Sequence, residues 1–349
     1  MKILVTGAKG FIGKNLIATL ENIRDGKDKT TALSPDLTIY ACDVDTPAAE
    51  LNRFCQDCDF VFNLAGVNRP KEEVEFMQGN FGFASRLLDT LKRYKNTCPV
   101  MLSSSTQASL QNPYGESKKA GEDLFFCYAK ETGAKVLVYR FPNVFGKWCR
   151  PNYNSAVATF CYNIARDLPI TVSDRSHEMT LVYIDDVVAE LVRASCGEET
   201  RDGAFCRVPV EHHATLGEIV DLLYGFKESR KTLAVPDMTN DSFSKKLYST
   251  YLSYLPGDAF SYPLTMHEDA RGSFTEILRT GNCGQFSVNI SKPGITKGNH
   301  WHHTKNEKFL VVQGEAVIRF RKIDEDKVYS YSVSGDKLEV VDIPTGYTH

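Results

Sequence analysis

Short apolar segments alternate with amphipathic helical patterns through the first two thirds of the chain, and this alternation constrains the fold more than any other feature. The first apolar segment is KILVT, residues 2–6, and an amphipathic pattern follows at 14–23. A strand–helix–strand order of this kind predicts a parallel sheet covered by helices on both faces. The other predicted strands and helices include 37–41, 59–66, 84–94, 99–105, 117–133 and 135–141. We therefore expect a doubly wound α/β fold in this part of the chain.

The pattern changes after the segment 261–274. Helical periodicity disappears there, and short apolar strands follow one another to the end of the chain. This predicts an all-β barrel or sandwich. A chain of 349 residues is long for a single hydrophobic core. We therefore expect two domains, 1–255 and 256–349.

Composition excludes several classes of protein. The net charge is −3, with 42% hydrophobic and 24% charged residues, which indicates a globular protein without the basic footprint of nucleic-acid or anionic-membrane binding. No apolar run approaches the length of about 18 residues that crosses a bilayer, and the first strand begins too early to leave room for a signal peptide. The ten cysteines lack framework spacing, and this favours free thiols in a reducing cytoplasm. The one C-x-x-C pair, Cys55 and Cys58, is interpreted as structural.

A glycine-rich loop follows the first apolar segment. Gly7, Gly10 and Gly13 form Gly-x-x-Gly-x-x-Gly between a strand and a helix. Glycines there allow a tight turn and let a pyrophosphate approach the N–H groups at the positive end of the helix. Because glycine turns also serve packing, the loop alone is a weak signal. Asp43, after the second strand, is a candidate partner for the ribose 2′-OH and so favours NADH, although it lies later in the chain than that rule expects.

Tyr114 and Lys118 form Tyr-x-x-x-Lys, a spacing that places both side chains on one face of a helix. A phenol with an ordinary pKa of about 10 needs a neighbouring cation to transfer a proton near neutral pH, and Lys118 can supply it. Residues 103–105 are three serines at the end of the preceding predicted strand, where a hydroxyl can bind a substrate carbonyl. Each feature is common by itself. Their order, at the carboxyl ends of strands, favours a catalytic site.

Residues 1 to about 250 resemble the extended short-chain dehydrogenase/reductases that act on nucleotide sugars, with a Rossmann-type sheet. The matching features are the glycine loop, Asn80 and the segments 62–66, 103–105, 114–118, 140–146 and 180–188. The resemblance implies that Tyr114 donates a proton to a ketone, while Lys118 lowers its pKa and binds the ribose. It implies that Ser105 orients the carbonyl, with Ser104 as the alternative.

The same resemblance places ligands against further residues. The cofactor is expected against Gly7, Gly10, Phe11, Ile12, Gly13, Asp43, Leu64, Ala65, Gly66, Tyr114 and Lys118. The sugar nucleotide is expected against Asn143, Lys147 and Arg175.

Four potential metal ligands lie in the last fifty residues. His300 and His302 are separated by one residue, Glu307 follows them, and His349 ends the sequence. Alternate residues of a strand face one side, so the first two are predicted to point together, with the others on adjacent strands. Imidazoles and one carboxylate suit Zn²⁺, Mn²⁺ or Fe²⁺. A lone histidine of a β domain is usually a surface residue, but this pattern is hard to obtain by chance. His303 is the reserve ligand.

The C-terminal pattern resembles both metal motifs of the cupin barrel, which implies a jelly-roll domain with one divalent metal, Zn²⁺ by preference. Residues 271–302 also resemble the opening of the sugar 4-keto 3,5-epimerases. That resemblance implies that Lys308 supports an enolate and that a histidine at the His300 position removes the proton. Because His300 also belongs to the metal pattern, a metal that polarises the ketone is the alternative, with the base unassigned.

Both domains together resemble the CapF-type bifunctional enzymes of bacterial capsule and O-antigen synthesis. The resemblance implies that the cupin epimerises C3 of a UDP-2-acetamido-2,6-dideoxy-4-hexulose and that the reductase domain then reduces the C4 ketone. The product is UDP-N-acetyl-6-deoxy-L-talosamine, the precursor of N-acetyl-L-fucosamine. Family members use NADPH, and we follow the family over the opposite indication from Asp43. We also expect a homodimer.

Two other classes of function remain open. One is a plain nucleotide-sugar 4-ketoreductase whose cupin serves only dimerisation and stability. The other is a regulator that senses redox state, which an intact Tyr114 and Lys118 argue against because a sensor needs no proton donor. The sequence stops at His349, where a barrel of this kind still needs strands, so we also expect a truncated barrel with weakened metal affinity.

Overall fold

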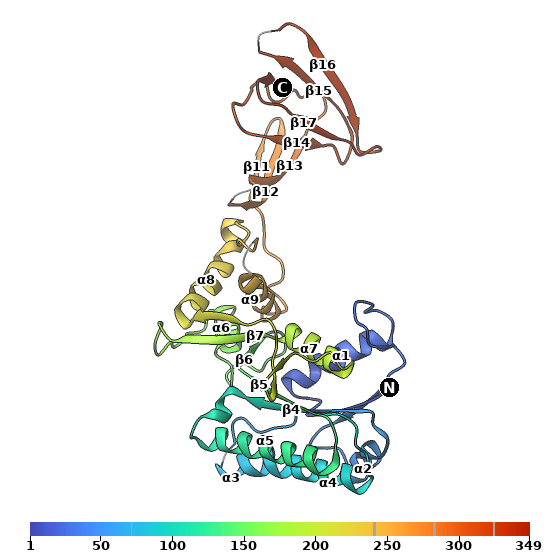
Figure 1. Cartoon of the computed structure of the whole chain (residues 1–349). Coiled ribbons are helices and arrows are strands. Elements are labelled where there is room, and N and C mark those ends of the chain that lie inside the picture. The colour runs from blue at the N-terminus through green and yellow to red at the C-terminus, as the bar shows by residue number, and fades with distance from the viewer. Residues whose placement is uncertain (71, 240–241, 282–283, 324) are drawn as a thin grey trace. The chain divides into compact units, whose positions relative to one another are not determined.

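A computed structural model describes residues 1–70, 72–239, 242–281, 284–323 and 325–349. The chain divides into two compact units (Figure 1), which are described separately below. The first comprises Met1–Pro263 with Leu278–Phe286, and the second comprises Leu264–Ile277 with Ser287–His349. The boundary expected near residue 255 stays a prediction. No helix among the described residues has the length and apolar character needed to cross a membrane.

The first unit is built on a sheet of seven strands in the order β2-β1-β3-β4-β5-β9-β8. All neighbours are parallel except β8, which pairs antiparallel with β9. The strands are β1 Lys2–Thr6, β2 Thr38–Cys42, β3 Phe60–Asn63, β4 Val100–Ser105, β5 Val136–Phe141, β8 Arg201–Asp202 and β9 Phe205–Cys206. This confirms the predicted Rossmann-type fold, and it brings the carboxyl ends of β1, β3 and β4 to one edge of the sheet.

Helices cover both faces of this sheet because alternate strand residues point to opposite sides. Ile3 and Val5 pack in one core with residues of α1 and α7, whereas Leu4 packs in a second core with residues of α2, α4 and α5. The helical segments are α1 Phe11–Arg24, α2 Ala48–Asp57, α3 Val74–Phe76, the π-helical turn η1 Met77–Gly82, α4 Phe83–Arg93, the 3₁₀ turn η2 Thr106–Ser109, α5 Pro113–Thr132 and α7 Ile184–Ser195. Figure 1 shows α4 and α5 side by side beneath the sheet.

A smaller sheet in the order β10-β7-β6 also belongs to the first unit. It packs with three helices around a third apolar core that includes Phe145, Leu181 and Leu223. The capping box predicted at Thr215 is present, with Glu218 as its reciprocal partner. The elements are β6 Asn143–Phe145, α6 Ala156–Ile164, β7 Glu178–Tyr183, β10 His212–Thr215, α8 Leu216–Thr232 and α9 Ser242–Ser253.

The C-terminal strands form antiparallel sheets in the orders β11-β12-β13, β14-β17 and β16-β15-β18. Their small core contains Phe320, Val333, Val341 and Ile343. The strands are β11 Met266–Asp269, β12 Gly272–Thr280, β13 Gly284–Ser291, β14 Glu307–Leu310, β15 Glu315–Lys322, β16 Val328–Ser334, β17 Val340–Ile343 and β18 Tyr347–Thr348. The all-β character predicted for this region is confirmed, whereas a closed cupin barrel stays a prediction.

Candidate functional site

The glycine loop connects β1 to α1 by a turn that only glycine fits. Gly7 has φ +67°, and a Cβ there would lie 2.7 Å from the backbone nitrogen of Ala65. A Cβ on Gly13 would lie 2.2 Å from the carbonyl oxygen of Gly7. Helix α1 begins at Phe11 without a side-chain cap, so the N–H groups of its first turn, including that of Ile12, are available to an anion.

Asp43 ties the end of β2 to this loop. One carboxylate oxygen accepts from the backbone N–H of Lys9 at 2.7 Å, and the other accepts from that of Val44 at 2.8 Å. The Lys9 ammonium pairs with Asp45. A carboxylate has about four lone-pair sites, so Asp43 retains acceptor capacity for a ribose hydroxyl. The cofactor preference predicted from this residue therefore stays a prediction.

The segment after β3 connects the glycine loop to Lys118. The N–H of Ala65 donates to the hydroxyl of Thr6 at 3.4 Å, next to the loop, and Leu64 lies against Gly7. A Cβ on Gly66 would lie 3.2 Å from the ammonium nitrogen of Lys118. Leu64, Ala65 and Gly66 thus lie between the two parts of the predicted site.

Asn80 belongs to the π-helical turn η1 and is buried. Its amide oxygen accepts from the N–H of Val67 at 2.9 Å, and its amide nitrogen donates to the hydroxyl of Ser117 at 2.9 Å. The side chain therefore fixes the segment after β3 against α5, one residue before Lys118.

Tyr114 and Lys118 occupy the first two turns of α5, which begins before the predicted range. Asn112 caps the helix by accepting from the N–H of Gly115 at 2.8 Å, and Pro113 takes the first helical position, where its missing N–H costs nothing. The Lys118 ammonium lies 5.7 Å from the centre of the Tyr114 ring. Because the capped helix begins at Pro113, Tyr114 and Lys118 lie four residues apart on the same face of one helix.

The electrostatic setting of this pair differs from that of free side chains. Burial raises the pKa of Tyr114, and its hydrogen bond with Ser105 lowers it. Burial lowers the pKa of Lys118 from 10.5 to about 8, although the carboxylate of Glu122 acts in the opposite sense. The ammonium also donates to the carbonyl oxygen of Ser103 at 3.1 Å. Lys118 is therefore a cation whose charge is sensitive to pH near neutrality.

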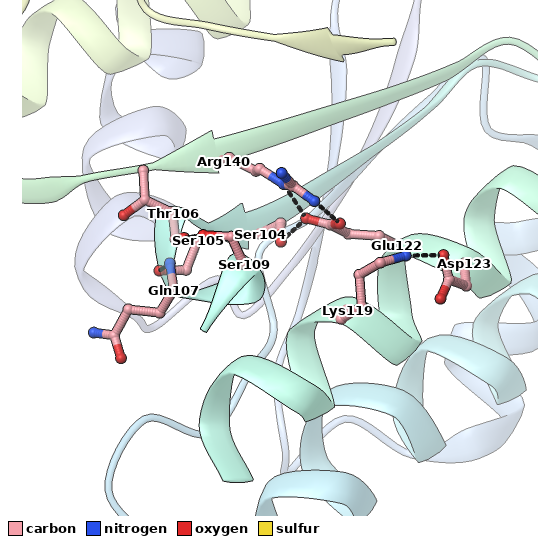
Figure 2. A network of polar contacts seen from close by, with 9 residues as sticks. All are labelled: Ser104, Ser105, Thr106, Gln107, Ser109, Lys119, Glu122, Asp123 and Arg140. Atoms are coloured by element: carbon pink, nitrogen blue, oxygen red, sulfur yellow. Dashed lines mark hydrogen bonds and ion pairs between the residues drawn. The ribbon is translucent and has the colours of Figure 1, made fainter. Parts of the chain in front are cut away.

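The three consecutive serines of β4 have three different partners on α5. The carbonyl of Ser103 accepts from Lys118, and Ser105 lies near enough to Tyr114 to lower the pKa of its phenol. The hydroxyl of Ser104 donates to Glu122 at 2.6 Å (Figure 2). The structure therefore directs Ser105 toward the phenol and Ser104 toward the interior. Their catalytic assignment stays a prediction.

Glu122 and Arg140 were not anticipated as residues of this centre. Glu122 is fully buried and forms two hydrogen bonds with the Arg140 guanidinium, at 2.8 and 2.6 Å. The sequence spacing could have indicated Glu122, because it follows Lys118 by the same four residues that separate Lys118 from Tyr114. Arg140 opens the segment 140–146, in which the sequence had indicated only a sugar-nucleotide contact.

The predicted sugar-nucleotide residues of the first unit have protein partners. Asn143 on β6 donates to the carbonyl of Thr180 at 3.2 Å. Lys147 pairs with Asp185, and one guanidinium nitrogen of Arg175 lies 2.7 and 2.8 Å from the two carboxylate oxygens of Asp221 on α8. In the C-terminal strands, Lys308 pairs with Asp342. Their role toward a substrate stays a prediction.

His300, His302, Glu307 and His349 come together, with one potential ligand atom from each lying within 4.8 Å of the others. The prediction that the first two alternate on a strand is wrong, because they lie between β13 and β14. Backbone bonds to the end of the chain hold them instead: the N–H of His349 donates to the carbonyl of His300, and that of Gly346 donates to His302. Glu307 is the first residue of β14, and His349 follows β18.

The chemistry of this group fits a divalent metal. Within the part of the chain that the structure describes, the buried Nδ1 of His349 has no hydrogen-bond partner. Burial and the neighbouring His300 lower the pKa of His349, which favours the neutral, ligating imidazole. Burial opposes the ionisation of Glu307, but the hydrogen bond from Lys305 at 2.6 Å and the charges of Lys305, His302 and His349 together lower its pKa. Three imidazoles and a carboxylate are a suitable donor set for Zn²⁺ and related metals.

His303, the reserve ligand, lies outside this group. Its ring packs against that of Trp301 at a centroid distance of 4.3 Å, and its side chain is exposed.

Comparisons with known proteins match both parts of the chain. The family model "NAD dependent epimerase/dehydratase family" matches residues 3–199, and "Polysaccharide biosynthesis C-terminal domain" matches residues 267–349. A Pseudomonas aeruginosa protein named UDP-2-acetamido-2,6-beta-L-arabino-hexul-4-ose reductase is 42% identical over all of this chain and 90% of its own length.

Solved structures agree with these matches. The capsular polysaccharide assembling protein CapF from Staphylococcus aureus is 55% identical, with a TM-score of 0.91 over 100% of this chain and 91% of that one. RMD from Pseudomonas aeruginosa, solved with NADPH, covers 65% of this chain and 82% of its own, with a TM-score of 0.53 and 23% identity, and so shares the fold alone. The chain therefore belongs to the NAD-dependent epimerase/dehydratase family and is a CapF-type, NAD(P)-dependent nucleotide-sugar enzyme.

Proposed function

We propose that this chain is a bifunctional enzyme that epimerises C3 of a UDP-2-acetamido-2,6-dideoxy-4-hexulose and then reduces its C4 ketone with NADPH. The product is UDP-N-acetyl-6-deoxy-L-talosamine. The observation that carries the reductase half is the arrangement of Tyr114 and Lys118 on one face of α5, with the Lys118 ammonium 5.7 Å from the centre of the Tyr114 ring and Ser105 near enough to lower the pKa of the phenol. The name of the full-length relative from Pseudomonas aeruginosa supports the choice of a UDP-4-keto sugar.

In reduction, a nicotinamide nucleotide held against the glycine loop and Lys118 would supply the hydride for C4. Tyr114 donates its phenolic proton to the ketone oxygen, which becomes the C4 hydroxyl. Ser105 orients that oxygen, and the Lys118 cation stabilises the phenolate left on Tyr114. The N–H groups at the start of α1 bind the pyrophosphate. These residues account for the acid, the orientation and the binding that ketone reduction needs.

Epimerisation belongs to the C-terminal domain in this proposal. A C4 ketone acidifies the adjacent C3–H, so a base can remove the proton and a proton can return on the other face. His300, His302, Glu307 and His349 would hold a divalent metal, which supplies Lewis acidity toward a ketone oxygen when bound. Lys308 is the proposed support for the enolate. We also propose a homodimer.

A second candidate is a reductase whose C-terminal domain takes no part in catalysis. The observation that favours it is the name of the full-length relative, which describes a reductase alone.

One experiment separates the two candidates. The UDP-4-keto sugar is incubated in D₂O with the metal-loaded enzyme and no NADPH, and deuterium at C3 is followed by mass spectrometry. Exchange at C3 that needs the C-terminal ligands supports the bifunctional enzyme. NADPH oxidation on an already epimerised sugar, without any C3 exchange, supports the plain reductase. Absence of both reactions contradicts the proposed function.

A further inference from the structure

A buried ion pair lies one helical turn beyond Lys118. The side chain of Glu122 is 1% exposed, and both of its oxygens accept from the Arg140 guanidinium of β5. The Ser104 hydroxyl is a third donor to the same carboxylate. A buried carboxylate in water-free surroundings is costly unless it is paired and hydrogen-bonded. Here Arg140 on β5 and Ser104 on β4 donate hydrogen bonds to the Glu122 carboxylate.

The position of Glu122 connects this pair to the reductase centre. Tyr114, Lys118 and Glu122 follow one another at intervals of four residues and so share one face of α5. Ser104, which bonds Glu122, stands between the serines that bond Lys118 and Tyr114. Figure 2 shows Glu122 of α5 bonded to Arg140 of β5 and to Ser104 of β4, whereas the adjacent Lys119 and Asp123 pair with each other.

We propose that Glu122 and Arg140 act as positioning residues for Lys118, holding α5 in register with β4 and setting the charge that Lys118 experiences. This rests on the proposed ketoreductase function. Neither residue is proposed to touch the substrate.

The charges around Lys118 determine in which direction each substitution should move its pKa. Glu122 raises the pKa of Lys118 against the larger effect of burial, which leaves it at about 8. Arg140 offsets the Glu122 charge, so the carboxylate supports the ammonium without forming a full ion pair with it. Tyr114 is the other titratable group facing Lys118. Among the described residues, the Lys118 ammonium also contacts two uncharged groups from other elements, the carbonyl oxygen of Ser103 and the backbone at Gly66.

The titration of Lys118 can be measured without cofactor or turnover. Protein labelled with ¹³C-lysine gives an ε-carbon signal for each lysine, and the Lys118 signal is assigned by its loss in Lys118→Arg. We expect its midpoint near pH 8 in the wild type. Glu122→Gln removes the supporting charge and leaves Arg140, so the midpoint should fall by about one pH unit. Glu122→Gln with Arg140→Gln removes both charges, so its midpoint should lie above that of Glu122→Gln alone and still below that of the wild type.

Asp123→Asn is the matched control. It removes the same charge one residue further along α5, from an exposed side chain that pairs with Lys119, and should not move the midpoint. Should Glu122→Gln fail to fold, Arg140→Gln tests the opposite sign, because the uncompensated carboxylate should raise the midpoint. Equal midpoints in the wild type and a folded Glu122→Gln, or no rise in a folded Arg140→Gln, overturn the proposal.

The pH profile of reduction gives a second readout. The alkaline limb of kcat/KM for NADPH should move to lower pH in Glu122→Gln and move back only in part in the double variant. If the wild type does not reduce the UDP-4-keto sugar, the proposed function fails, and the titration in the free protein still decides the role of Glu122.

Discussion

The glycine loop allows a sharp prediction from a single added methyl group. In Gly13→Ala, the new Cβ would lie 2.2 Å from the Gly7 carbonyl oxygen and 3.0 Å from the backbone of Ala8, against an ordinary contact of at least 3.4 Å. Both neighbours are backbone, so the loop must move by about 1 Å. We expect a cost of about 3 kcal/mol for this overpacking, offset by about 1 kcal/mol of improved helix propensity. The net loss in free energy of unfolding is about 2 kcal/mol.

Gly225→Ala is the control, because Gly225 lies in α8 with no atom within 4 Å of an added Cβ. The same substitution should there stabilise the protein by about 1 kcal/mol. Urea unfolding measures both changes, and NADPH fluorescence measures binding, which we expect Gly13→Ala to weaken at least tenfold because the displaced loop misaligns its N–H groups. Gly13→Ala with wild-type stability and affinity would refute the reasoning.

Four further predictions concern the chemistry. Tyr114→Phe should abolish NADPH oxidation and preserve deuterium exchange at C3, and loss of both in a folded variant contradicts the two-site arrangement. Because the folded-state pKa of Lys118 is about 8 against 10.5 for the free side chain, reduction should decline as the pH rises through 8. Lys118 affects stability with the opposite pH dependence. Because its pKa is lower in the folded protein, its contribution to the free energy of unfolding is fully present above pH 10.5 and is lost as the pH falls through 8. Unfolding measured across this pH range checks this. Glu307→Gln should lower bound metal, measured by elemental analysis, while reduction of an epimerised sugar continues; loss of reduction in a metal-free, folded protein would be the contrary result. kcat/KM should favour NADPH over NADH, and a clear NADH preference would show that Asp43 decides the cofactor.

The sequence predicted the parts of the fold and site that depend on local spacing. The glycines and the pair Tyr114 and Lys118 are set by the period of a single turn or helix, so their positions follow from the residues alone. The potential metal ligands were also found by spacing. The reason given for His300 and His302 was wrong, because pairing with the chain end, not strand alternation, holds them.

Features that depend on which segments meet could not be predicted. The choice between Ser104 and Ser105 depends on how β4 is rotated, and this follows from its pairing with β3 and β5. Arg140 is recognised as a partner of Glu122 only when β5 lies beside β4. The carboxylate of Asp43 gave a cofactor hypothesis from its place after β2, but its bonds to Lys9 and Val44 appear only in three dimensions.

The three serines of β4 also determine where this chain can change length. Each contacts one of three α5 residues spaced four positions apart, so these contacts depend on the spacing within both the strand and the helix. A single residue inserted within 103–105 or within 114–122 would mismatch all contacts beyond it. The connection between them, which contains only the short turn η2 before Asn112, carries none of these three matches. Insertions in that connection are therefore far less disruptive than insertions in the elements it joins, and the short spacing between Ser105 and Tyr114 is compatible with an intact centre.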